Sequence, residues 1–136
     1  MCNLNFTSMK KILISMMVLV AVSTSTYALN PSDYGVFYKL NEKSTFTGVV
    51  NYLKADKEQA DYLKLVFKVT AEELKNAAKT GNEKFADTVL NYNLYNTKCA
   101  LSESQYSKYL VLINLSINNK SNDLFSEDIL ISDISK

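Results

Sequence analysis

The apolar positions between residues 45 and 117 repeat at helical spacing and predict four helices joined by short turns. The second helix, residues 56–80, is the longest, and the other helices are expected to cover its apolar face. Its apolar residues recur three or four positions apart, so they fall on one side of a helix. These residues are Ala60, Leu63, Val66, Phe67, Thr70, Leu74, Ala77 and Ala78.

Capping residues mark the ends of this long helix and the start of the next. Asp56 and Gln59 have the spacing of a capping box, and Gly81 supplies the residue without a Cβ at which such helices end. Asn82 is expected to cap the third helix, residues 83–100. The third helix contains several asparagines, whose helix propensity is only moderate, so either tertiary packing stabilises it or it frays towards its end.

The first and fourth helices carry similar signals. Ser44 is expected to cap the first helix, residues 45–53. Ser102 and Gln105 form a second capping box, which opens the fourth helix, residues 103–117. The fourth helix is apolar around most of its circumference, a pattern typical of a helix buried between partners.

The fold class predicted from these patterns is all-α: a small bundle of about four helices over residues 45–117. Residues 29–44 are interpreted as an N-terminal arm, irregular or briefly helical, whose aromatic side chains lie against the bundle. Residues 118–136 are interpreted as a C-terminal tail. A docking helix, an edge strand and a tail that orders on binding remain open for this segment, and a loosely attached tail is favoured.

Residues 1–28 have the pattern of a bacterial signal peptide. Lys10 and Lys11 precede an apolar run, residues 12–22, and small residues then lead to a cleavage site after Ala28. The run is about half as long as the roughly 20 residues that a spanning helix needs. We therefore expect export to the periplasm or beyond, with no stable membrane span after cleavage. An uncleaved membrane anchor is the alternative.

The charge balance gives no basis for nucleic-acid binding. Removal of Lys10 and Lys11 with the signal leaves 13 of the 15 lysines against 14 acidic residues, a net charge near −1. The chain has no arginine, the usual bidentate ligand of phosphate and guanine. Cys99 would remain as a single cysteine, expected to be a small apolar core residue without an internal disulfide; a reactive or partner-linking thiol is the alternative.

The composition excludes the commonest catalytic and metal sites. The chain has no histidine, which removes Ser-His-Asp and Cys-His catalysis and histidine metal ligands. Three glycines do not form a phosphate-binding loop. Glu72 and Glu73 are neighbours on one helix and so do not face each other as a catalytic pair would. We expect a protein that is not an enzyme and has no cofactor or metal.

The candidate contact surface lies on the long helix, next to its core face. Tyr62, Leu65 and Val69 form a second apolar stripe beside the core face. It is either covered by the helix at residues 45–53 or left as a patch for a second subunit or a client. Lys64 and Lys68 lie beside it, on a lysine stripe that is either a solvated face or a surface for acidic partner segments.

The two capping boxes resemble the LTxxQ repeats of the Spy/CpxP group of bacterial periplasmic helical proteins. They read Ala-Asp-Lys-Glu-Gln over residues 55–59 and Leu-Ser-Glu-Ser-Gln over residues 101–105, and each opens a helix. The resemblance implies an ATP-independent chaperone or stress-sensor partner that binds clients as a homodimer. The chain is also similar to small secreted helical proteins of Gram-negative bacteria, which imply no particular activity.

We therefore expect an exported binding protein, and two classes of partner remain open. A Spy-like holdase would bind many unfolded clients through weak apolar contacts. A secreted module, such as a sensor ligand, inhibitor or host-interaction factor, would bind one folded protein. The candidate contact residues in either case are Tyr62, Lys64, Leu65, Lys68 and Val69.

Overall fold

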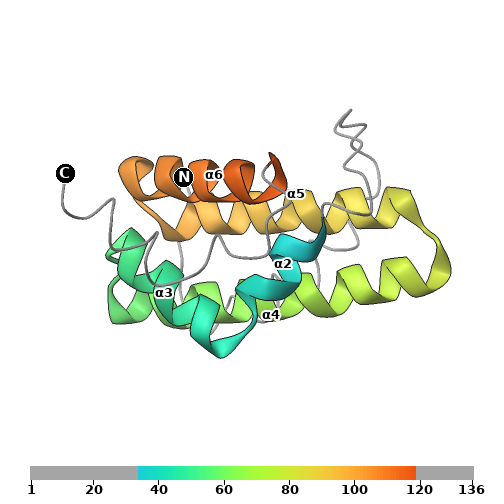
Figure 1. The fold of residues 1–136 in the computed structure, drawn as a ribbon, viewed down its shortest axis with the longest axis horizontal. Helices are drawn as coiled ribbons and strands as arrows, with labels where there is room; N and C mark the ends of the chain where they lie inside the picture. Colours follow the sequence, from blue (N-terminus) through green and yellow to red (C-terminus); the bar gives the residue numbers. More distant parts are fainter. Residues whose placement is uncertain (1–33, 119–136) are drawn as a thin grey trace.

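The computed structural model describes residues 34–118, which form five helices and contain no strand within that range (Figure 1). The prediction of an all-α bundle is confirmed, and the four predicted helices match α3 to α6 to within two residues at each end. The predicted signal peptide and almost all of the predicted C-terminal tail lie outside the described residues. The helices are α2 (Gly35–Leu40), α3 (Lys43–Leu53), α4 (Lys57–Thr80), α5 (Glu83–Ala100) and α6 (Glu103–Asn118).

The long helices α4 and α5 form an antiparallel pair, and α6 runs back along α5 (Figure 1). The contact between α4 and α5 is the most extensive in the bundle. The short helices α2 and α3 pack against each other; α2 also contacts α4, and both contact α6. The core therefore lies between the α4–α5 pair and a cover made of α2, α3 and α6.

The predicted caps of α4 and α5 are confirmed. Asp56 Oδ1 accepts the Gln59 backbone N–H at 2.8 Å, and Gln59 Oε1 accepts the Asp56 backbone N–H at 3.1 Å. Gly81 ends α4 with a φ of 63°, a left-handed conformation that suits glycine. Asn82 Oδ1 accepts the Phe85 N–H at 3.0 Å at the start of α5. Local sequence thus determines where the central helix pair begins and turns.

The prediction that Ser44 caps α3 is wrong. The helix begins at Lys43, and Glu42 occupies the cap position with an extended backbone. The Glu42 N–H donates to Lys39 O at the end of α2, and Glu42 O accepts the Phe46 N–H at 2.8 Å. The tight turn from α2 therefore places the start of α3 before Ser44.

The described part of the predicted N-terminal arm belongs to the core. Its helix α2 buries Phe37 and Leu40, which are 2% and 0% exposed. The alternative of a briefly helical arm is therefore correct for residues 35–40. Burial of two large apolar side chains stabilises the fold by roughly 3 to 6 kcal/mol before entropy is counted, so α2 is an integral part of the bundle.

Asn93 is fully buried and joins three helices through its side-chain amide. Its Nδ2 donates to Thr70 Oγ1 on α4 at 3.0 Å, and its Oδ1 accepts the Tyr109 hydroxyl of α6 at 2.6 Å. The Tyr109 ring also stacks on Phe67 of α4, with ring centroids 5.9 Å apart. Tertiary contacts thus stabilise the asparagine-rich α5. Of the two alternatives for this helix, stabilisation by packing or fraying at its end, the structure supports stabilisation by packing.

The two capping-box glutamines meet at one end of the bundle. Gln59 Nε2 donates to Gln105 Oε1 at 2.9 Å, and Gln105 Nε2 donates to Gln59 Oε1 at 3.1 Å. Each amide also reaches a carbonyl at the end of another helix: Gln59 Nε2 donates to Ala100 O, and Gln105 Nε2 donates to Leu53 O. The starts of α4 and α6 are therefore bonded to the ends of α5 and α3.

Cys99 on α5 is half-buried and disulfide-bonded. The expectation of a single unpaired cysteine concerns the chain after removal of residues 1–28, and it stays a prediction for that chain.

Replacement of Asn93 tests the link between the three helices. We expect Asn93→Ala to lower the free energy of unfolding by about 2 to 4 kcal/mol, because it removes the Asn93 oxygen that accepts from the buried Tyr109 hydroxyl and creates a cavity. Urea unfolding followed by circular dichroism measures the change. Asn51→Ala, at an exposed position of α3, is the control and should change stability by less than about 0.5 kcal/mol. Equal losses in the two variants would contradict the role of Asn93.

Buried phenols make the fold sensitive to alkaline pH. Burial, assisted by the nearby Tyr95, raises the pKa of Tyr62 from 10.0 to about 12, and burial also raises the pKa of Tyr109. The unfolded chain ionises first, so the stabilisation is complete below pH 10 and is lost between pH 10 and about pH 12. Urea unfolding across this window should show falling stability, with a smaller fall in Tyr62→Phe. A constant unfolding free energy would refute this expectation.

Candidate functional site

The outer face of α6 exposes three large apolar side chains. Leu110, Val111 and Leu115 are 40%, 51% and 47% exposed, and we call them the α6 strip. The prediction that α6 is buried on most sides is wrong for this face, because none of the other described helices covers it. The inner face is held by Tyr109, which is fully buried. A helix apolar on nearly all sides is therefore covered on one side only.

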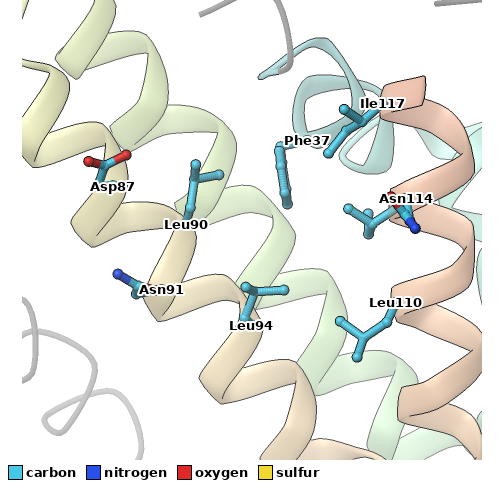
Figure 2. Close-up of a pocket in the computed structure, with 9 residues that line it drawn as sticks. Phe37, Asp87, Leu90, Asn91, Leu94, Leu110, Asn114 and Ile117 are labelled. Atoms are coloured by element: carbon cyan, nitrogen blue, oxygen red, sulfur yellow. The ribbon is translucent and has the colours of Figure 1, made fainter. Parts of the chain in front are cut away.

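A cavity of about 340 Å³ lies between α5 and α6, with Phe37 of α2 also lining it. We call it the α5–α6 cavity. In Figure 2, Leu90 and Leu94 of α5 lie across from Leu110 and Ile117 of α6, with Phe37 between the two helices. Polar side chains lie on both sides: Asp87 and Asn91 on α5, and Asn114 on α6. The described residues that line the cavity are Phe37, Asp87, Leu90, Asn91, Leu94, Leu110, Ile113, Asn114 and Ile117.

Among the described residues that line the cavity, Asp87 is the only charged one. It is half-buried, and within residues 34–118 no donor or cation is bonded to its carboxylate. Leu110 lines the cavity and also belongs to the α6 strip, so the apolar surface continues from the cavity onto the outside of α6. The arrangement offers apolar contact together with one unpaired negative charge.

The five candidate residues on α4 do not line this cavity. Tyr62 is 5% exposed, and its hydroxyl donates to Asn96 Oδ1 of α5 at 2.7 Å. Leu65 and Val69 are half-buried, and Val69 packs at the edge of the core. Lys64 and Lys68 are exposed. The predicted stripe is thus divided, with Tyr62 inside the core and covered by α5.

The lysines of α4 form a largely solvated face. Lys68 Nζ lies 3.9 Å from Glu72 Oε1, and both side chains are about 60% exposed. An exposed pair of this kind contributes less than about 1 kcal/mol. The helix α3 meets α4 elsewhere, through an edge-to-face contact of Phe46 with Phe67.

The sequence interpretation missed the cavity residues of α5 and α6. The sequence predicts that Leu110 belongs to a helix buried on most sides, and it predicts no role for Asp87. The available signal was the continuous apolar pattern of residues 109–113, which is wider than the one face that neighbouring helices can cover.

The described helices contain neither a metal site nor a membrane span. No group of His, Cys, Asp or Glu side chains between residues 34 and 118 has an arrangement that could hold a metal ion. Among the same residues, no helix has the length and apolar character needed to cross a membrane.

Comparison of the chain with protein-family models, curated proteins and solved structures found no match.

Two leucines that line the same cavity should differ in their contribution to stability. Leu90 is 3% exposed and belongs to the core, whereas Leu110 is 40% exposed. We expect Leu90→Ala to cost about 2 to 4 kcal/mol of unfolding free energy and Leu110→Ala less than about 1 kcal/mol. Urea unfolding of the two variants measures this difference. A large loss in Leu110→Ala would show that Leu110 is a core residue and not part of an available surface.

Proposed function

We propose that this protein is an exported, non-enzymatic binding protein of the cell envelope that holds apolar segments of unfolded proteins, in the manner of a holdase chaperone. The observation that carries the proposal is the α6 strip together with the α5–α6 cavity. Exposed apolar side chains that adjoin an apolar cavity are a common feature of protein-interaction sites. Leu110 connects the two parts, so one apolar segment can contact both.

The exposed area favours weak and reversible binding. Covering a half-exposed leucine or valine contributes on the order of 1 kcal/mol. Three such residues give only a few kcal/mol, which offsets part of the entropy lost on association. Contacts of this strength release a client quickly, and a holdase without an energy source needs rapid release.

Three further features support the proposal. Residues 1–28 have the pattern of a signal peptide, which supports export to the periplasm or beyond. The two motifs that resemble the LTxxQ repeats are bonded to each other through Gln59 and Gln105, which supports their treatment as a matched pair. The absence of histidine from the sequence supports a function that needs no general acid–base group.

The test is the aggregation of a chemically unfolded model protein, followed by light scattering with and without the full chain. We expect suppression at near-stoichiometric ratios. Val111→Ser/Leu115→Ser should reduce suppression, because it removes apolar contact area on α6. The matched variant Leu65→Ser/Val69→Ser makes the same chemical change on α4, next to Lys64 and Lys68, and should retain suppression. Circular dichroism must show that both variants are folded at the assay temperature.

The outcomes separate the two classes of partner. Loss of suppression only in the α4 variant would move the contact surface to the α4 stripe. No suppression by the folded protein would refute the holdase proposal and favour a module that binds one folded partner. In that case a stoichiometric complex should be found by pull-down from envelope extracts.

A further inference from the structure

We propose that the α5–α6 cavity binds a polypeptide segment in which a large apolar side chain lies next to lysine or arginine, with Asp87 pairing to the cation. The inference deepens the proposed function, on which it rests, by naming the chemistry of the bound segment. The apolar side chain lies between α5 and α6, and the cationic group lies at Asp87.

The apolar part of the site is already formed. Six of the nine lining residues are apolar, and they come from α2, α5 and α6. Its volume of about 340 Å³ is at the lower end of the range of roughly 300 to 1,000 Å³ typical of ligand pockets. A cavity of this size suits one or two large side chains.

The negative charge of Asp87 favours a ligand with a positively charged residue next to its apolar side chain. The Asp87 carboxylate is half-buried at the cavity and, within the described helices, is bonded to no cation or donor. Partial burial of a carboxylate is costly unless an opposite charge or a donor compensates it. None of the described residues that line the cavity is a lysine, so a cationic group of the ligand can pair with Asp87. A segment with acidic neighbours would instead be repelled.

The shape of the surface favours a chain over a small molecule. Small-molecule sites enclose most of their ligand, whereas this cavity continues through Leu110 onto the exposed α6 strip. An extended segment can place one side chain in the cavity and its neighbours on Val111 and Leu115. The chain's own residues 119–136 are poorly suited, because they carry four acidic residues against two lysines.

The experiment compares two labelled peptides by fluorescence anisotropy with the full chain. In one, a Leu-Phe pair is flanked by lysines, and in the other the same pair is flanked by glutamates. We expect the lysine peptide to bind more tightly. Asp87→Asn should weaken it roughly two- to fivefold, as for a partly exposed ion pair, and Asp87→Lys should reverse the order of the two peptides. Leu110→Ala should weaken both peptides by the same factor.

Asp61 provides the matched control, because it is an exposed aspartate on α4, a helix that does not line the cavity. Asp61→Lys makes the same change in net charge and should leave the order of the peptides unchanged. Equal binding of both peptides to the unmodified protein, or reversal by Asp61→Lys, would overturn the role of Asp87.

Other occupants give different results. A synthetic peptide of residues 119–136 should not displace the lysine peptide. If it binds more tightly and displaces the lysine peptide, the ligand of the cavity is the chain's own C-terminal segment and the proposal is wrong. If peptide binding is lost as the protein concentration rises, a second copy of the protein competes for the cavity and the proposed peptide ligand is wrong. Suppression of aggregation with no preference between the peptides refutes this inference and leaves the proposed function standing. A preference for the lysine peptide without suppression supports the site and refutes the holdase.

Discussion

The fully buried amide of Asn93 is the constraint on which the rest of the bundle depends. It has one donor partner and one acceptor partner on two other helices, so its bonds are made only when α4, α5 and α6 are in register. Apolar contacts alone tolerate sliding of one helix along another, but a buried amide does not, because an unpaired polar group in the core costs about 1 to 3 kcal/mol. A polar residue thereby determines the arrangement of an otherwise apolar core.

The Gln59–Gln105 pair applies the same principle at the helix ends. Each glutamine closes a capping box locally, and its remaining N–H groups bond to the other glutamine and to a carbonyl at the end of a different helix. Two connections that are far apart in sequence are thus joined by main-chain and side-chain bonds at one place. This end of the molecule behaves as one unit, whereas the end at Gly81 is a simple turn between α4 and α5.

The helices could be predicted from the sequence because their signals are local. The cap at Asp56, the left-handed Gly81 and the apolar spacing of α4 depend only on nearby residues, and all three are present in the structure. The start of α3 could not be placed correctly, because it depends on the turn from α2. The candidate site could not be located either. Burial of Tyr62 and exposure of Leu110 are decided by which helix packs where, and apolar spacing alone does not contain that information.

The anchoring of α6 has a mechanical consequence for the cavity. The first turn of α6 is bonded to the end of α3 through Gln105, and Tyr109 is bonded to Asn93 of α5. The α6 residues that line the cavity lie between Leu110 and Ile117, after both of these bonds in the sequence. Leu112 and Ile113 are also buried in the core, so the middle of α6 is held as well, and Ile117 is only partly buried. The part of α6 with the fewest buried contacts is therefore its last turn, which carries the Ile117 side of the cavity lining.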